Sequence, residues 1–231
     1  MQHPFCLPGK AMKTEYVRHS AGRMFENDFL EAASKIHPVT PFAFYIPIIT
    51  GLLGWGLWNG TTRMGMVALY APLGFLTWCF MEYTLHRNLF HWEGNGPLTR
   101  RFHAIIHGYH HTYPDDPQRL VMPLGASIPL AILIGGLLWL VGRPDATLPY
   151  FVGIVVGYLA YDYLHWAVHY KKPWTNWGKA LRAHHMAHHF ACPDKNFGIS
   201  HRWIDRLMGS TQVRGQAARE AAMKPDTGAA E

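Results

Sequence analysis

The sequence predicts an all-α integral membrane protein with four transmembrane helices and a cytosolic helical cap that holds a histidine-rich site for two metal ions. Three observations predict this fold class: four long apolar segments, an uneven distribution of Lys and Arg, and four clusters of histidines. The composition agrees, since 49% of the 231 residues are hydrophobic and only 16% are charged.

The apolar residues gather in four segments, each long enough, or nearly so, to cross a bilayer as a helix. The first and third contain no charged residue, the second carries only Glu82, and the fourth carries only Asp162 and the titratable His165. A soluble helical bundle is the alternative, but its helices would show a polar stripe that the third and fourth segments lack. The expected spans are residues 42–58, 64–85, 121–141 and 147–168.

Three parts of the chain follow from these spans. Residues 1–41 are expected to form a cytosolic or interfacial segment, in which 10–36 lie as a helix at the membrane surface. One face of that helix would carry Phe25, Phe29, Ala33 and Ile36. Residues 42–212 form the membrane domain, and residues 213–231, which contain no aromatic side chain, are expected to be a flexible tail.

The orientation follows from Lys and Arg, which concentrate on the cytoplasmic side of membrane proteins. Residues 1–41 hold five, residues 86–120 hold four and the chain after 168 holds ten, whereas the two short loops opposite hold only Arg63 and Arg143. We therefore expect both termini, the central loop and the histidine clusters on the cytoplasmic side. Because topology already explains the basic charge, and no nucleic-acid motif occurs, nucleic acid is not an expected partner.

Four histidine clusters supply ten imidazoles, a number too large for one ion and suited to two. The second and fourth share the pattern HxxHH, and the third is HxxxH, so their members share a helix face. His86 and His91 are five residues apart, which turns an ideal helix by about 140°, so this pair requires a helix end or a distortion. The ten candidate ligands are His86, His91, His107, His110, His111, His165, His169, His185, His188 and His189.

Two metals held by neutral histidines at a membrane surface indicate three classes of function. The first is oxygen activation on a lipid, because breaking an unactivated C–H bond requires an oxidant that only metal and O₂ supply. The second is a membrane metallohydrolase that uses a metal-bound hydroxide. The third is metal binding or transport without catalysis, although transport sites place their ionisable residues inside the spans.

Several stretches give this chain a family resemblance. HxxxxH, HxxHH, HxxxH and HxxHH occur in this order on four spans, with Glu82-Tyr83, residues 161–165, 183–190 and 196–200 around them. This set resembles the fatty acid hydroxylase/sterol desaturase superfamily, and within it the fatty acid 2-hydroxylases, over roughly residues 20–212.

The resemblance implies that the ten histidines bind two metal ions, with iron expected in the active form and zinc possible in purified protein. It implies O₂ as co-substrate and a membrane lipid or fatty acid as substrate, hydroxylated at C2. A sterol or carotenoid oxidase or desaturase of the same superfamily is the alternative. Eukaryotic 2-hydroxylases carry a fused cytochrome b5 domain, for which 231 residues leave no room, so a separate electron-donor protein is expected.

Two carboxylates and three further histidines complete the set of candidate residues. Glu82 precedes His86 by four residues and Asp162 precedes His165 by three, so each is expected to accept the second N–H of a metal-bound imidazole. An interfacial acid that reaches for water is the alternative for both. The remaining histidines are His103, which lies one turn before His107 and is a candidate support for it, and His184 and His201, which are expected at the surface or in packing.

Overall fold

The computed structural model describes residues 22–212, and in this part of the chain every regular element is helical. The predicted all-α fold is confirmed. The expected tail at 213–231 and the first part of the expected surface helix, residues 10–21, lie outside the described residues. The elements are α1 (Asp28–Ala33), α2 (Thr40–Trp58), α3 (Met64–Leu85), η1 (His86–Phe90), α4 (Pro97–His103), η2 (Ala104–Gly108), α5 (Tyr109–Thr112), α6 (Leu124–Val141), α7 (Pro144–Tyr170), α8 (Asn176–Phe190) and α9 (Arg202–Leu207).

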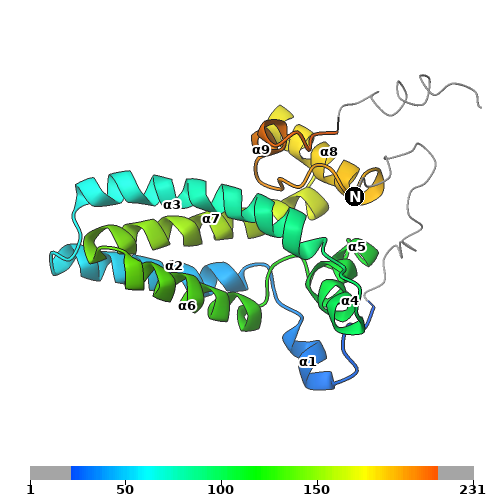
Figure 1. The fold of residues 1–231 in the computed structure, drawn as a ribbon, viewed down its shortest axis with the longest axis horizontal. Helices are drawn as coiled ribbons and strands as arrows, with labels where there is room; N and C mark the ends of the chain where they lie inside the picture. Colours follow the sequence, from blue (N-terminus) through cyan, green and yellow to red (C-terminus); the bar gives the residue numbers. More distant parts are fainter. Residues whose placement is uncertain (1–21, 213–231) are drawn as a thin grey trace, which may run out of the picture.

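Four long helices lie side by side and form the membrane domain (Figure 1). These are α2, α3 continued by η1, α6 and α7, and each is long and apolar enough to cross a membrane. With η1 counted as part of the cap, each of these four helices begins and ends within three residues of the expected span. The chain passes up and down the bundle, so the two short connections after α2 and α6 lie at one end, and the other described elements outside the four long helices lie at the opposite end.

α7 is the central helix, and it packs most closely on α3. Two glycines allow this approach, since a Cβ on Gly74 would lie 2.0 Å from the Tyr150 carbonyl oxygen and one on Gly153 would lie 2.0 Å from the Ala71 carbonyl oxygen. Small residues let the backbones of membrane helices come close, which increases van der Waals contact. The pairing of α3 with α7 also brings the His86 end of one helix beside the His165 end of the other.

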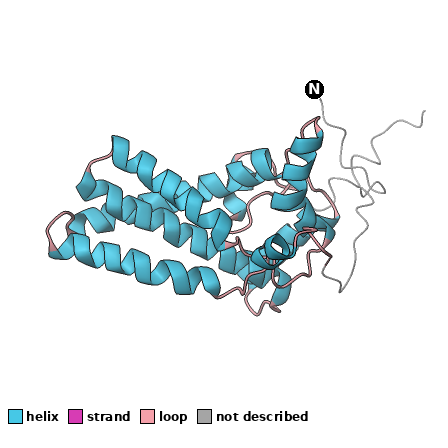
Figure 2. Ribbon diagram, turned by 90° about the horizontal axis from the view of Figure 1, so that it is seen from below, coloured by secondary structure: helices cyan, strands magenta, loops and turns pink. Residues whose placement is uncertain are grey.

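The short helices gather in a cap at one end of the bundle (Figures 1 and 2). η1, α4, η2 and α5 lie between α3 and α6, and α8 and α9 follow α7. Because α3 and α7 both end at the cap, and because α5 and α8 lie within it, all four histidine clusters come to the same end of the molecule.

The segment before the first span differs from expectation. Within residues 22–36 only Asp28–Ala33 is helical, and Asn27 caps it by accepting hydrogen bonds from the Phe29 and Leu30 N–H groups. The helix presents Glu31 to the protein and leaves Phe29 exposed. Glu31 is buried because it pairs with Arg119 of the central loop, an interaction that the apolar periodicity of this segment could not reveal.

Candidate metal centre

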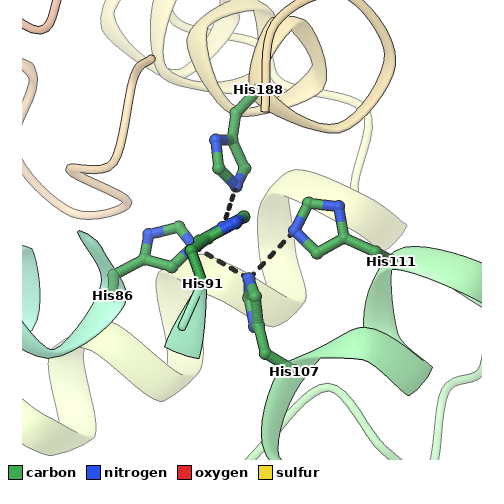
Figure 3. Close-up of side chains that lie close together, drawn as sticks. All are labelled: His86, His91, His107, His111 and His188. Carbon is green, nitrogen blue, oxygen red and sulfur yellow. Dashed lines mark hydrogen bonds between the residues drawn. The ribbon is translucent and has the colours of Figure 1, made fainter. Parts of the chain in front are cut away.

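The ten histidines converge into two groups of five, and in each group the ligand-type nitrogens all lie within 4.8 Å of one another. We call the groups the first and the second cage. Figure 3 shows the rings of the first cage directed at a common centre from three parts of the chain. The first cage consists of His86, His91, His107, His111 and His188. The second consists of His110, His165, His169, His185 and His189.

The two HxxHH motifs each contribute to both cages. In the central loop, His107 and His111 belong to the first cage and His110 to the second. In α8 the assignment is reversed, since the pair four residues apart belongs to the second cage and the middle histidine, His188, belongs to the first. Residues three and four apart lie near the same helix face, so the spacing brings all three histidines of a motif toward the cages. Which of them enters which cage depends on how α5 and α8 face each other. Each motif therefore holds the two cages at a defined separation.

His86 and His91 reach one cage because the helix between them is distorted. Residues His86–Phe90 form a π-helix, η1, whose wider turn joins residues i and i+5. The two ring centroids lie 5.1 Å apart as a result. The predicted requirement for a helix end or a distortion at this pair is confirmed. A second π-helix, η2 (Ala104–Gly108), precedes His110 and contains His107.

The spacing of the nitrogens fits a metal ion at the centre of each cage. In the first cage the Nε2 atom of His107 lies 3.0 Å from that of His86 and 2.9 Å from that of His111. In the second cage the Nε2 atom of His110 lies 2.9 Å from that of His189 and 3.0 Å from that of His165. Two nitrogens about 2.1 Å from one ion and at right angles lie about 3.0 Å apart, and opposite ones lie about 4.2 Å apart.

The tautomers support the same conclusion. His86 donates its Nδ1–H to the Phe197 carbonyl at 2.5 Å, His188 donates to Lys195 at 2.8 Å, and His165 donates to Leu120 at 2.8 Å. A neutral imidazole that donates through Nδ1 carries its lone pair on Nε2, and these Nε2 atoms are the ones directed into the cages. Lone pairs that converge in this way repel one another unless a cation lies between them, so the residues present fit a bound metal.

The histidines of the cap are neutral, as ligands must be. Burial, together with the neighbouring imidazoles, lowers the pKa of His91 to about 2. Burial and neighbouring imidazoles also bring the pKa values of His107, His110 and His111 well below the ordinary value. The same causes act on the cap histidines of α8, namely His185, His188 and His189.

Glu82 and Asp162 support the cages, but not by the contact that we predicted. Within residues 22–212 neither carboxylate accepts a hydrogen bond from an imidazole. The Oε1 atom of Glu82 accepts the N–H groups of Ile199 and Ser200 at 2.8 and 2.7 Å, and the Oδ1 atom of Asp162 accepts the Met122 N–H at 3.3 Å. The expectation of a direct bond was wrong because buried backbone N–H groups of two loops also require acceptors. Each carboxylate holds the loop whose carbonyl orients the nearby histidine.

The loop at 195–200 turns sharply beside the first cage. Asn196 adopts a left-handed φ of 59°, a conformation that asparagine tolerates better than most residues. Its side chain accepts the Gln212 N–H at 2.8 Å and donates to the His184 carbonyl at 3.3 Å. This turn directs the Lys195 and Phe197 carbonyls toward His188 and His86. The sequence carried no signal for these roles, because a backbone carbonyl accepts a hydrogen bond whatever side chain it bears.

The histidines outside the cages have other partners. His184 is buried and donates to Asp205 at 2.9 Å, so it is not a surface residue, and Asp205 itself was not predicted as part of the site. His201 packs against Phe75, as expected for a packing residue. His103 donates to the Phe90 carbonyl at 2.7 Å, at the end of η1, rather than to His107.

A cavity of about 450 Å³ reaches the first cage from the cap side, with His91 and His111 in its wall. The wall of the cavity is part apolar and part polar, and it carries charge of both signs, from Arg101 and Glu93, together with the Tyr113 ring. Residues before the first span also form part of the wall, through Arg23 and Met24. The first cage can therefore be approached from outside the bundle.

Comparisons with known proteins agree with this architecture. The family model described as fatty acid hydroxylase matches residues 71–210, which contain all ten histidines of the cages. Dihydroceramide fatty acyl 2-hydroxylase FAH2 of Arabidopsis thaliana is 34% identical over 199 residues, which cover 86% of this chain and 84% of that protein. Fatty acid 2-hydroxylase of Mus musculus is 30% identical over 206 residues, and the match covers 79% of this chain and 55% of that protein.

Similarity also extends to a solved structure. The hydroxylase domain visible in full-length scs7p superimposes with a TM-score of 0.75 at 26% identity, covering 80% of this chain and 70% of that one. The match to the family model spans more than half of the chain, and the Arabidopsis relative covers most of its length. The chain therefore belongs to the fatty acid hydroxylase family and is an enzyme of that family, an oxidoreductase of the membrane.

Proposed function

We propose that this protein hydroxylates a fatty acyl chain at C2, in a membrane lipid or free fatty acid, with O₂ as co-substrate and two metal ions in the histidine cages. The single observation that carries the proposal is the pair of five-histidine cages in a chain of this family. The relatives are named as 2-hydroxylases of fatty acids or of dihydroceramide acyl chains, which supports C2 as the position. The reaction consumes O₂, two electrons and two protons, and yields the hydroxylated chain and water.

The metals are proposed to be iron in the active enzyme, with zinc as a possible occupant after purification. Five imidazoles suit either ion, so the donor set does not select between them. The first cage would hold one ion and the second the other. When bound, two irons would supply the oxygen-binding positions and carry the externally supplied electrons that O₂ activation requires, which no side chain provides.

The chain itself holds and orients these groups. The Phe197, Lys195 and Leu120 carbonyls fix three rings in the Nδ1–H tautomer, which leaves Nε2 free to bind metal. Glu82 and Asp162 immobilise the loops that bear these carbonyls, and this is the role that we propose for them in catalysis. The α3 and α7 ends place the cages at the end of the apolar bundle, where an acyl chain can reach them without passing through water.

The cavity beside the first cage is a suitable place for the polar end of the substrate. A C–H bond at C2 is one carbon from the carbonyl group, so the head of the molecule must lie close to the metals when C2 is attacked. The cavity offers Arg101 as a cation and Tyr113 as a phenol, and its volume of about 450 Å³ is within the range of small-molecule pockets. We propose that this cavity binds the carbonyl group of the substrate and the head group attached to that carbonyl.

We propose that both termini and the metal centre lie on the cytoplasmic side. The support is the distribution of Lys and Arg, because the connections at the far end of the bundle carry only Arg63 and Arg143. Electrons would come from a separate donor protein that approaches the cap. This partner is a proposal drawn from the chemistry, since the reaction requires two external electrons.

The test is the lipid product formed under ¹⁸O₂. Cells that express the protein should accumulate an acyl species heavier by one ¹⁸O atom, with fragmentation that places the hydroxyl at C2. His165→Ala should abolish this product, because His165 is a member of the second cage, whereas the matched change His37→Ala, at an exposed histidine outside the cages, should not.

Other outcomes separate the alternatives. Oxygen taken from water would indicate a metallohydrolase, and an oxidised sterol or carotenoid would indicate the other branch of the superfamily. No new lipid would indicate a metal-binding protein without this activity. Full activity in His165→Ala would contradict the role of the cages.

A further inference from the structure

The carboxylate of Asp205, in α9, is buried within the cap and surrounded by hydrogen-bond donors. Its Oδ1 atom accepts from the Phe197 N–H at 2.9 Å and from the Ser210 hydroxyl at 2.7 Å. Its Oδ2 atom accepts from the Gly198 N–H at 2.7 Å and from His184 at 2.9 Å. Burial raises the pKa of this carboxyl group, but the hydrogen bonds from His184, Ser210 and the Gly198 N–H outweigh it and hold the pKa below its ordinary value, so the group is ionised. A full negative charge therefore lies beside the loop of the first cage.

One of these donors belongs to the peptide group that orients a metal ligand. The Gly198 N–H and the Phe197 C=O are the two ends of a single planar peptide group. The N–H end donates to Asp205, and the C=O end accepts the Nδ1–H of His86 at 2.5 Å. The result is a continuous series from carboxylate to peptide to imidazole, which ends at the Nε2 atom directed into the first cage.

We propose that Asp205 is a positioning and polarising residue for the first cage, acting on His86 through the Phe197–Gly198 peptide group. This inference rests on the proposed metal centre. In many metal sites a carboxylate accepts the ligand N–H directly, which fixes the ring and raises its basicity. Here the Phe197–Gly198 peptide group lies between the carboxylate and the ring. Because hydrogen bonds in series polarise one another, the charge of Asp205 makes the Phe197 carbonyl a stronger acceptor for the Nδ1–H of His86.

The second cage lacks this device among the described residues. His165 also donates to a carbonyl, that of Leu120, but Asp162 accepts the Met122 N–H, which belongs to the next peptide group along the chain. The Nδ1 atoms of His185 and His189 have no hydrogen-bond partner in the described part of the protein. The first cage, by contrast, has two rings oriented by carbonyls, those of His86 and His188. We therefore expect the first cage to bind its metal ion more tightly than the second.

The first experiment removes the charge of Asp205 and measures metal affinity. Metal-free protein is titrated with Co²⁺ against a competing chelator, and bound Co²⁺ is followed by its absorption bands. In Asp205→Asn we expect one of the two dissociation constants to rise by roughly 10- to 100-fold, the usual effect of changing a group behind a ligand, while the other stays as in the wild type. The absorption bands of the weakened site should also shift, because the basicity of a ligand has changed.

Glu82→Gln is the matched control. It removes a carboxylate that holds the same loop, but through the Ile199 and Ser200 N–H groups rather than through the peptide group of Phe197 and Gly198. The polarising role predicts a larger loss of affinity in Asp205→Asn than in Glu82→Gln. Equal losses in the two variants, or an unchanged affinity in Asp205→Asn, would show that the residue only immobilises the loop and would overturn the proposal.

A second experiment does not depend on the folding of an Asp205 variant. One equivalent of Co²⁺ is added to His111→Ala, which lacks a ligand of the first cage, and to His189→Ala, which lacks one of the second. The tight ion should persist in His189→Ala and be lost in His111→Ala, and equal or reversed affinities would overturn the proposal. The wild-type protein is titrated first. If it binds fewer than two ions, the proposed metal centre itself is contradicted, and this outcome is distinct from a failure of the role proposed for Asp205.

Discussion

Arg119 is the residue through which the segment before the first span is joined to the second cage, and its replacement gives a quantitative prediction. Its guanidinium is buried, pairs with Glu31 of α1 and with Asp116 at 2.6 Å, and donates to the Tyr109 hydroxyl at 2.9 Å. The next residue, Leu120, supplies the carbonyl that orients His165. Arg119→Met keeps most of the side-chain volume and removes the charge.

The size of the effect follows from the two carboxylates that are left behind. Removing one partner of a buried ion pair costs about 3–5 kcal/mol, because the remaining charge is uncompensated. We expect the lower end, about 3 kcal/mol, since Lys35 also lies 3.2 Å from Glu31. For a chain of this size the loss corresponds to a decrease in Tm of roughly 6–12 °C.

Thermal unfolding of the purified protein in detergent measures this loss, and metal analysis of the same samples reports the second cage. Glu31→Gln combined with Arg119→Met should recover part of the stability, because one uncompensated charge is then removed. The network would not have the role that its burial indicates if Arg119→Met melted at the wild-type temperature. The same would follow if the double variant lost more stability than the two single variants lose together.

Three further predictions concern the membrane topology, the acid response and the span-end carboxylate. A cysteine introduced at Arg63 should react with an impermeant reagent added outside intact cells and one at Gln118 should not, and labelling of Gln118 from outside would contradict the proposed orientation. Burial raises the pKa of Glu31, but hydrogen bonds from the Phe25 N–H, Lys35 and Arg119 outweigh it and lower the pKa to about 2. The ionised Glu31 side chain therefore contributes its full stabilisation above about pH 4.5, and this stabilisation is lost as the pH falls toward 2. Between pH 5 and 3 the Tm should fall less in Glu31→Gln than in the wild type. Glu82→Gln should keep measurable hydroxylase activity, since an amide oxygen can still accept a hydrogen bond from the Ile199 or Ser200 N–H group. Glu82→Ala should lose more of the activity, which a product assay at matched expression levels would measure.

The fold was predictable from the sequence because its main signals are local. Apolar length predicts the four long helices, and the described helices end close to the expected positions. The helix expected at 10–36 was the exception, since in the described part of that segment, residues 22–36, only Asp28–Ala33 is helical. A salt bridge to Arg119, 88 residues away in sequence, determines how that segment packs, and no local pattern contains it.

The candidate site was predictable in its members and less so in its arrangement. Histidine spacing identified the residues that gather in the cages and the distortion between His86 and His91. The way in which each HxxHH motif is divided between two cages depends on how α5 and α8 face each other. Asp205 and the Phe197 carbonyl were missed for a different reason, because their roles arise from hydrogen bonds to the backbone, which the side-chain sequence does not encode. The orientation across the membrane and the character of residues 213–231 stay predictions.

The metal content of active protein tests the central claim most directly. Purified protein that forms the ¹⁸O-labelled product should contain about two transition-metal ions per chain, one for each cage. His188→Ala, in the first cage, and His110→Ala, in the second, should each lower the content toward one ion without preventing membrane insertion. Active wild-type protein with a metal content near zero or one would contradict the account.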